Sequence, residues 1–196
     1  MIKKPEPVPV PKTTEVIPPK FVVLDLEANG LLYDADTVHC MVLRYPNDNT
    51  SVFTDGAVNP AGYSGKVEGN IGTGVEQLKH LWNQGYTIVG HNVLGYDFPL
   101  LKKLGLFDLD YIPELGTKVP DVLDTYIGVC LRFPEERPGL DYWGHKFGVR
   151  KPAHADWSKL RGDMIHRCSE DTKINEVLLR HLDAPGYLDA EWHEAR

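Results

Sequence analysis

Two acidic residues, Asp25 and Glu27, stand two positions apart at the end of the apolar run 21–24 in the segment FVVLDLEANG. A run this rich in β-branched and apolar residues is typical of a buried central strand, and residues two apart on a strand point to the same face. The two carboxylates would repel each other there unless a positive charge lay between them. Their spacing therefore predicts a bound cation at the carboxyl end of the strand, where open α/β sheets place their ligand sites. Strand-end carboxylates that face solvent or pair with lysine are the alternative.

A further acidic residue, Asp97, ends the segment VGHNVLGYD and comes directly before an apolar helical pattern. Pro99 fits the first turn of that helix, and Asp97 fits its N-cap position. The residues alone leave a capping role and a metal-ligand role equally open for Asp97, and the two roles are compatible.

A third segment, MIHRCSEDTKINEVLLRHL, contains His166 and Asp171. Its apolar residues recur with helical spacing and predict a core-facing stripe: Ile174, Val177, Leu178 and Leu182. Asp171 falls on nearly the same face, where an acid without a partner is costly, which favours a metal or another cation beside it. A salt bridge with lysine or arginine is the alternative. His166 falls at or just before the expected helix start, where a surface histidine is the alternative to a functional one.

The elements that must position these residues follow from hydrophobic periodicity and turn residues. We expect strands at 21–26, 38–45, 50–54 and 86–90, and helices at about 75–84, 97–104, 120–132, 140–147 and 163–182. Residues 55–74, rich in Gly, Asn and Ser, are expected to form a loop. Three consecutive strands, a helix, a strand and a series of helices predict a mixed α/β sheet domain.

Composition limits the classes of protein that fit. The 196 residues suit one domain, and no apolar run approaches the length needed to span a bilayer. The N-terminus lacks the apolar stretch of a secretory signal, and three cysteines without a CxxC pair favour a reducing, cytoplasmic setting over a zinc ribbon. The net charge of −7 counts mildly against broad duplex binding. It does not exclude a protein that holds a few nucleotides through divalent ions.

We expect three segments along the chain. Six prolines fall within residues 1–19 and predict an extended, flexible leader. The folded domain is expected to cover residues 20–185, and residues 186–196 are expected to form a C-terminal tail.

Taken together, Asp25-x-Glu27, HNxxxYD ending at Asp97, and His166-x-x-x-x-Asp171 resemble the three motifs of the DEDD (DnaQ-like) 3′–5′ exonucleases. The segments DLEANGLL, GHNVLGYDFPLL, VLDTYIGVCL, DYWGHKFG and RCSEDTKINEVL follow the order found in the proofreading domains of bacteriophage family-A DNA polymerases. The resemblance covers residues 21–182. It implies an α/β, ribonuclease-H-like fold: a mixed five-stranded sheet flanked by helices in a single domain.

The resemblance also implies a catalytic site with two ions, Mg²⁺ or Mn²⁺, about 4 Å apart. Asp25 would bridge both ions. Glu27 and Asp171 would hold the ion that carries the nucleophilic water, and Asp97 would anchor the second. His166 would be the general base, because imidazole titrates near neutral pH.

Members of this family carry either a tyrosine four residues before the last aspartate or a histidine five residues before it. Arg167 occupies the tyrosine position here and His166 the histidine position, so the spacing fits the histidine subtype. The phage polymerase domains often carry the tyrosine. Cys168 stands where the histidine subtype usually has alanine.

The implied activity is 3′–5′ hydrolysis of single-stranded or frayed DNA, with proofreading as one use. Ala28, Asn29, Leu32 and Asn92 would contact the substrate, Asn29 and Leu32 through backbone and wedge contacts. The implied partner is a DNA polymerase, in trans or as a missing C-terminal portion, and no membrane is involved. An exoribonuclease of the same family and a catalytically silent module that binds or tethers a 3′ end are the alternatives.

Other polar and aromatic residues are given structural roles. Asp124 and Thr125 are expected to cap and pack a helix, and Asp121 to be a charge at a helix N-terminus. Trp143 and Phe147, four residues apart, are expected in the core rather than in a base-stacking platform. A basic cluster either follows a phosphate backbone or forms a solvated face: Lys146, Arg150, Lys151, Lys159 and Arg161.

Overall fold

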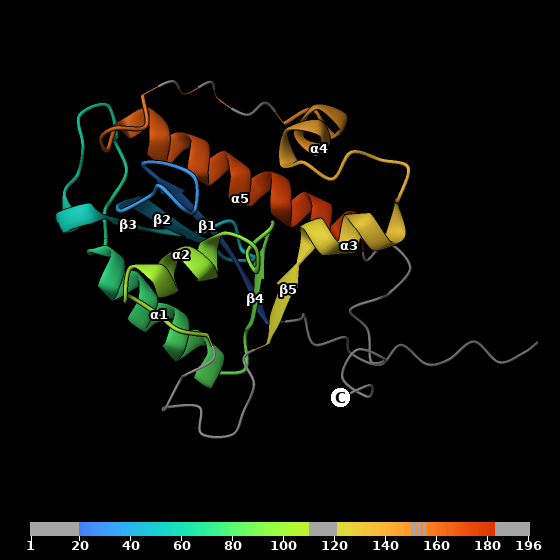
Figure 1. Cartoon of the computed structure of the whole chain (residues 1–196), viewed down its shortest axis with the longest axis horizontal. Coiled ribbons are helices and arrows are strands. Elements are labelled where there is room, and N and C mark those ends of the chain that lie inside the picture. Colours follow the sequence, from blue (N-terminus) through green and yellow to red (C-terminus); the bar gives the residue numbers. More distant parts are fainter. Residues whose placement is uncertain (1–19, 110–120, 150–151, 153, 155, 183–196) are drawn as a thin grey trace, which may run out of the picture.

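The structure, a computed structural model, describes residues 20–109, 121–149, 152, 154 and 156–182. Within these residues five strands form one mixed sheet in the order β3-β2-β1-β4-β5 (Figure 1). The strands are β1 (Phe21–Ala28), β2 (Val38–Arg44), β3 (Thr50–Thr54), β4 (Thr87–Gly90) and β5 (Val122–Asp124). β1, β2 and β3 pair antiparallel, whereas β4 and β5 join β1 in parallel. The predicted mixed five-stranded α/β fold is confirmed.

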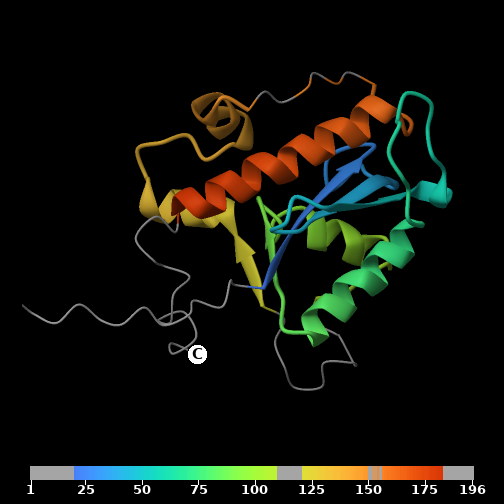
Figure 2. The same ribbon diagram turned by 180° about the vertical axis from the view of Figure 1, so that it is seen from behind.

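Five α-helices cover this sheet. They are α1 (Ile71–Asn83), α2 (Asp97–Lys103), α3 (Thr125–Arg132), α4 (Leu140–Phe147) and α5 (Gly162–Leu182), and a short 3₁₀ helix, η1 (Asp55–Ala57), follows β3. The long helix α5 crosses one face of the sheet, while α1 and α2 lie on the opposite face (Figures 1 and 2). α3 and α4 pack beside the C-terminal half of α5.

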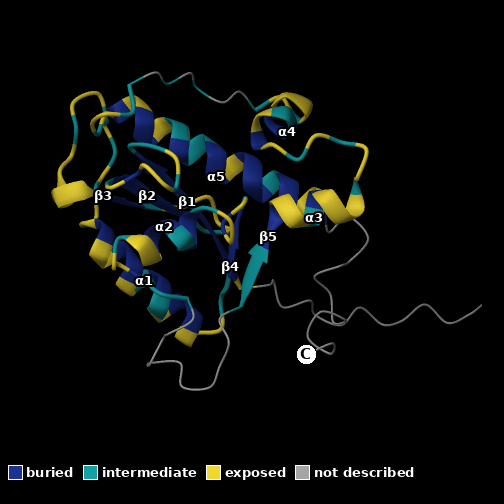
Figure 3. Cartoon of the chain, in the orientation of Figure 1, coloured by how far each residue is buried: buried dark blue, intermediate teal, exposed yellow. Residues whose placement is uncertain are grey.

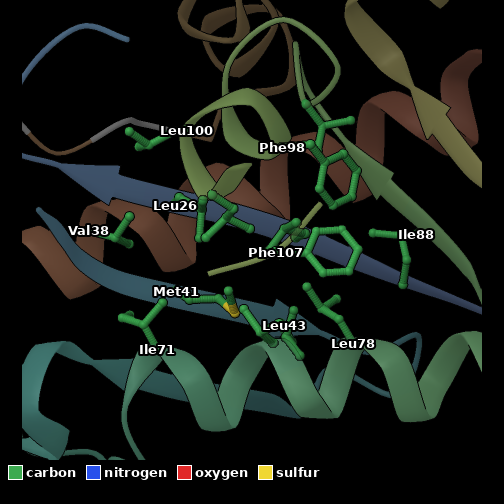
Figure 4. Packing of buried hydrophobic residues seen from close by; sticks show 14 of the residues in the cluster. Leu26, Val38, Met41, Leu43, Ile71, Leu78, Ile88, Phe98, Leu100 and Phe107 are labelled. Atoms are coloured by element: carbon green, nitrogen blue, oxygen red, sulfur yellow. The ribbon is translucent and has the colours of Figure 1, made fainter. Parts of the chain in front are cut away.

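Side chains of the central strands alternate between two clusters, as the twofold period of a strand requires. The face toward α1 and α2 contributes to the main core, which includes Leu26, Met41, Leu43, Ile71, Leu78 and Phe98 (Figure 4). The face toward α5 forms a second cluster of Cys40, Val42, Val52, Met164, Ile165 and Cys168. Helices cover both faces of the sheet. The acidic side chains of β1, Asp25 and Glu27, lie near the carboxyl end of the strand, on the face toward α5.

The segment predicted as a helix at 120–132 begins instead as a strand. Val122 and Leu123 pair in parallel with Ile88 and Val89 of β4, and the helix starts only at Thr125. The prediction that Asp121 is a helix-terminal charge is therefore wrong. A three-residue strand is too short to show a periodicity of its own, and pairing with a buried neighbour overrides local helix propensity.

Helix α1 begins at Ile71, within the segment predicted as a loop. The side chain of Asn70 caps it by accepting a hydrogen bond of 2.9 Å from the amide of Thr73. Gly72 and Gly74 near its start lower helix propensity, and for this reason the sequence pattern did not predict a helix there. Gly74 has a packing reason, because a Cβ there would lie 2.9 Å from the ring of Phe53.

Two structural predictions are confirmed at the other edge of the sheet. Asp124 is the N-cap of α3 and accepts a hydrogen bond of 2.9 Å from the amide of Tyr126. Trp143 is fully buried and Phe147 half-buried, and both pack in one cluster with residues of α5. Figure 3 shows that α4 has both buried and exposed stretches. Both rings thus belong to the core.

The expected leader at 1–19, the tail at 186–196 and the last residues of the expected domain lie outside the described residues. Among the helices of the described ranges, none is long and apolar enough to cross a membrane.

Candidate metal centre

Three carboxylates meet at the carboxyl half of β1. Asp25 and Glu27 come from β1, Asp171 comes from α5, and one ligand atom of each lies within 4.8 Å of the others. β1 directs Leu24 and Leu26 into the main core, so the alternate residues Asp25 and Glu27 face α5. Asp171 is 4% exposed and lies on the sheet-facing side of its helix. The strand and helix periods together bring these three acids to one point.

The donor set fits a hard divalent ion. Oxygen ligands of one Mg²⁺ lie about 2.1 Å from the metal, so pairs of them are about 3–4 Å apart. The three carboxylates are close enough to reach that spacing with small side-chain rotations. They supply only oxygen atoms, which favours Mg²⁺ or Mn²⁺ over zinc.

Asp97 is the first residue of α2 and is buried next to this cluster. The cap position belongs to Tyr96, so the prediction of Asp97 as N-cap is displaced by one residue. Burial raises the pKa of the Asp97 carboxyl group well above its usual value, and the charges of Glu27 and Asp124 add to this. Hydrogen bonds from the amides of Asp97 itself and of Leu26 act in the opposite direction. Asp97 is thus held against the backbone of β1 as a fourth acid of the site.

Sequence reasoning missed a role for Tyr96, although it stands inside the HNxxxYD motif. Its hydroxyl donates a hydrogen bond of 2.6 Å to the carbonyl of Gly30, which ties the start of α2 to the loop after β1. Burial and the nearby charges of Asp97, Glu27 and Asp25 raise the pKa of Tyr96 to about 12. The phenol therefore stays protonated beside the four acids.

The residues predicted to contact substrate after β1 build the loop that follows this strand. Ala28 is buried at a bulge at the end of β1, and Leu32 is half-buried against the main core. The side chain of Asn29 bonds both Asp36 and the amide of Thr37. The amide of Asn29 itself bonds the carbonyl of Thr37. These contacts fix the loop beside the carboxylates.

Asn92 lies in the corresponding loop after β4 and has a left-handed backbone, with φ of 61°. Its amide donates a hydrogen bond of 2.8 Å to Asp124, which also accepts one from the amide of Leu94. Asp124 therefore does more than cap α3, because it also holds the loop that leads to Asp97. The sequence showed Asp124 only as a cap, since the pairing of β4 with β5 that brings it there was not visible.

His166 and Arg167 occupy different sides of α5. The helix begins at Gly162, so His166 lies inside it rather than at its start. With about 100° of rotation per residue, Arg167 is about 40° from Asp171 around the axis and His166 about 140° away. His166 is exposed and is not among the residues that the structure brings together.

Arg167 is the neighbour of the acid cluster on this face. Its Nε lies 3.4 Å from Oε1 of Glu27. Its Nη1 donates a hydrogen bond of 2.8 Å to the carbonyl of Pro152, and its guanidinium carbon lies 5.3 Å from the ring centre of Trp157. The adjacent Cys168 is buried, and burial is the main cause that raises the pKa of its thiol. Cys168 therefore packs α5 onto the sheet as a neutral group.

The predicted basic cluster lies in several different settings. Lys146 pairs with Glu136 at 2.5 Å, and Arg161 pairs with Asp163 at 3.2 Å. Lys159 is exposed, and Arg150 and Lys151 lie outside the described residues. Contact of this cluster with a phosphate backbone stays a prediction.

No protein-family model matches the chain, and no curated protein matches it in sequence. Solved structures do match. Brucella melitensis NrnC bound to pGG is 16% identical, with a TM-score of 0.57 over 92% of this chain and 80% of that one. Exonuclease I is 13% identical, with a TM-score of 0.55 over 85% of this chain and 41% of that one. The fold is that of the ribonuclease-H-like exonucleases.

A family B DNA polymerase from the archaeon Pyrobaculum calidifontis has the same fold in part of its chain. It is 18% identical, with a TM-score of 0.56 over 88% of this chain and 26% of the polymerase. The present chain thus spans most of NrnC, less than half of exonuclease I and about a quarter of the polymerase. The likeness to phage family-A polymerases and the histidine subtype stay predictions.

Proposed function

We propose that this chain is a metal-dependent 3′–5′ exonuclease that hydrolyses phosphodiester bonds at the 3′ end of single-stranded or frayed DNA. The observation that carries the proposal is the convergence of Asp25, Glu27 and Asp171 within 4.8 Å in an exonuclease fold. Carboxylate oxygens gathered around one point are the ligands that a hard divalent cation binds.

Each acid has a role that its position supports. Two divalent ions would supply an activated water and would stabilise the attacking and leaving oxygens of the phosphodiester. Asp25 lies within 4.8 Å of both Glu27 and Asp171, and it would be the ligand shared by the two ions. Glu27 and Asp171 would hold the ion that supplies the activated water, and Asp97, at the start of α2, would hold the second ion.

The solved relatives support the choice of ion and of ligand class. NrnC has been solved with bound Mg²⁺, and a further NrnC structure contains pGG. By this analogy we propose Mg²⁺ or Mn²⁺ as the cofactor and a nucleic-acid 3′ end as the ligand. A DNA polymerase, in trans or as a further portion of a longer protein, is the proposed partner, and proofreading is the proposed use.

His166 is the proposed general base. Its ring is exposed, so it can pass a proton to solvent, and imidazole titrates near the working pH. Arg167 lies one turn before Asp171 on nearly the same face of α5, but a guanidinium does not lose its proton in proteins and cannot serve as a base. The family spacing supports His166, while its direction on α5, about 140° from Asp171, makes solvent the alternative base.

The proposal is tested by release of mononucleotides from a labelled oligodeoxynucleotide with Mg²⁺ or Mn²⁺. We expect stepwise shortening from the 3′ end by the wild-type chain and loss of this activity in Asp25→Ala. Glu170→Gln is the matched control, because Glu170 is the next carboxylate to Asp171 on α5 and pairs with Lys173. An Asp25→Ala variant as active as wild type would exclude the proposed site.

The same assay separates the substrate classes. DNA and RNA oligonucleotides of one sequence differ mainly in the 2′-hydroxyl, so the ratio of their rates reports the preference directly. We expect faster hydrolysis of DNA. Titration of Mn²⁺ by calorimetry separates the enzyme from a silent 3′-end-binding module, since only the enzyme needs an intact metal site.

A further inference from the structure

Arg167 places a positive charge against one of the proposed metal ligands. Its Nε lies 3.4 Å from Oε1 of Glu27, and the two side chains are only 20% and 11% exposed. The Nε–H has no hydrogen-bond partner among the described residues, so this contact is an ion pair without hydrogen-bond geometry. The guanidinium is therefore near Glu27 but is not locked to it.

Other contacts of Arg167 fix the position of its head group. The ring of Trp157 packs under the guanidinium, and the carbonyl of Pro152 accepts a hydrogen bond from Nη1. Neither contact neutralises the positive charge. Arg167 is therefore a rigid cation at the edge of the acid cluster, one helical turn before Asp171.

The charge balance of the metal-bound site indicates a role for the guanidinium of Arg167. The four carboxylates of the proposed site formally balance two divalent ions, which leaves the guanidinium without a counter-charge. A phosphodiester carries one negative charge, and its oxygens are the acceptors that a guanidinium binds best. A metal ion that takes Glu27 as a ligand also weakens the attraction of Glu27 for Arg167.

We propose that Arg167 binds a phosphate of the substrate, and that Glu27 is its counter-ion only while the metal ions are absent. The inference rests on the proposed function, since it requires a metal site that uses Glu27. It assigns to Arg167 a positioning and charge-stabilising role rather than the proton transfer expected of the tyrosine that many members of the family resembled by the sequence carry at this position.

The test combines two measurements on Arg167→Met. The first is the affinity for Mn²⁺ by calorimetry without nucleic acid. We expect binding about tenfold tighter than in wild type, because the competing charge beside Glu27 is gone. The second is kcat/KM on a 3′-labelled oligodeoxynucleotide at saturating Mn²⁺. We expect a decrease of roughly 10²-fold, which is typical for loss of one donor to a reacting group.

Arg180→Met is the matched control. Arg180 lies on the same helix, pairs with Glu176 at 2.7 Å and has its guanidinium 5.8 Å from the ring centre of Phe21. Like Arg167, Arg180 lies beside a carboxylate and an aromatic ring, but these are different residues and lie away from the acid cluster. We expect wild-type Mn²⁺ affinity and wild-type kcat/KM in this variant.

The opposite signs of the two changes identify the role. A structural residue would weaken both Mn²⁺ binding and turnover, and a simple counter-ion would tighten Mn²⁺ binding while leaving kcat/KM unchanged; either result overturns the inference. If Arg167→Met does not fold, Arg167→Lys replaces it, with both changes expected in the same directions but smaller. Wild-type protein that neither binds Mn²⁺ nor shortens DNA would overturn the proposed function itself, which distinguishes the two failures.

Discussion

The two halves of helix α5 both bury a carboxylate against the sheet, but they treat its charge differently. In the C-terminal half, Glu176 is 8% exposed and is paired with Nε of Arg44 at 3.0 Å and with Nη2 of Arg180 at 2.7 Å. In the N-terminal half, Asp171 meets Asp25 and Glu27, and the guanidinium of Arg167 lies beside Glu27. The buried acid of the C-terminal half is thus paired with cations, whereas in the N-terminal half three acids converge.

This difference shows why burial of an acid alone does not mark a functional site. A carboxylate between two guanidiniums is a structural ion pair, and it joins α5 to β2 through Arg44. Three carboxylates around a point, with one guanidinium at the edge, form a donor set that suits a divalent cation. The charges around Glu176 and around Asp171 therefore distinguish the C-terminal half of α5, which is structural, from the N-terminal half, which is the candidate catalytic half.

The largest expected effect concerns the histidines of the two halves. We expect His166→Ala to reduce turnover at neutral pH by roughly 10²–10⁴-fold, the range for loss of a general base. His181, in the last turn of the helix, stacks on Phe133 at 5.3 Å, and His181→Ala should leave turnover unchanged. Single-turnover rates on a labelled oligonucleotide measure both. Equal rates for His166→Ala and wild type would assign the proton to solvent.

The second expected effect is a difference in sign for stability. Glu176→Gln leaves two guanidiniums without their shared carboxylate and should lower the free energy of unfolding by about 3 kcal/mol. Asp171→Asn removes one of several like charges and should raise that free energy in metal-free protein. Urea unfolding in the presence of a chelator measures both variants. A loss of stability in Asp171→Asn as large as in Glu176→Gln would remove the distinction between the two halves.

The third effect is stabilisation of the fold by a bound metal ion, which should depend only on the N-terminal half of α5, where Asp171 lies. Mn²⁺ at about 100 times its Kd should raise the free energy of unfolding by about 2.7 kcal/mol if it binds only the folded chain. We expect the same increment in Glu176→Gln, measured from its own lower baseline, and none in Asp171→Asn. An equal increment in both variants would place the bound ion elsewhere.

Local periodicity was sufficient to predict much of this arrangement. The twofold period of β1 puts Asp25 and Glu27 on one face, and the 3.6-residue period of α5 turns Asp171 inward. The antiparallel strands and the long helix were visible for the same reason. These features depend on residues close together in the sequence, so they can be predicted from local sequence patterns.

The features that the sequence did not predict depend on contacts between segments far apart in the chain. The strand β5 exists because it pairs with β4, and the contact of Arg167 with Glu27 joins residues far apart in the chain. The starting residue of α5 also had to be known before the directions of His166 and Arg167 could be compared. Each of these features follows from tertiary packing, which a motif or a hydrophobic pattern does not encode.

The smallest expected effect concerns Asp97, the fourth acid near the N-terminal half. Burial raises the pKa of its carboxyl group, so the folded chain keeps a proton that the unfolded chain has lost. Stability should therefore fall as pH rises from about 4 to the raised pKa, with a slope of at most about 1.4 kcal/mol per pH unit. Asp97→Asn should remove this part of the slope in metal-free protein, and urea unfolding across pH 4–8 measures it. Parallel curves for Asp97→Asn and wild type would mean that Asp97 carries its charge in the fold at no cost, and that the excess of acids is already balanced without a metal.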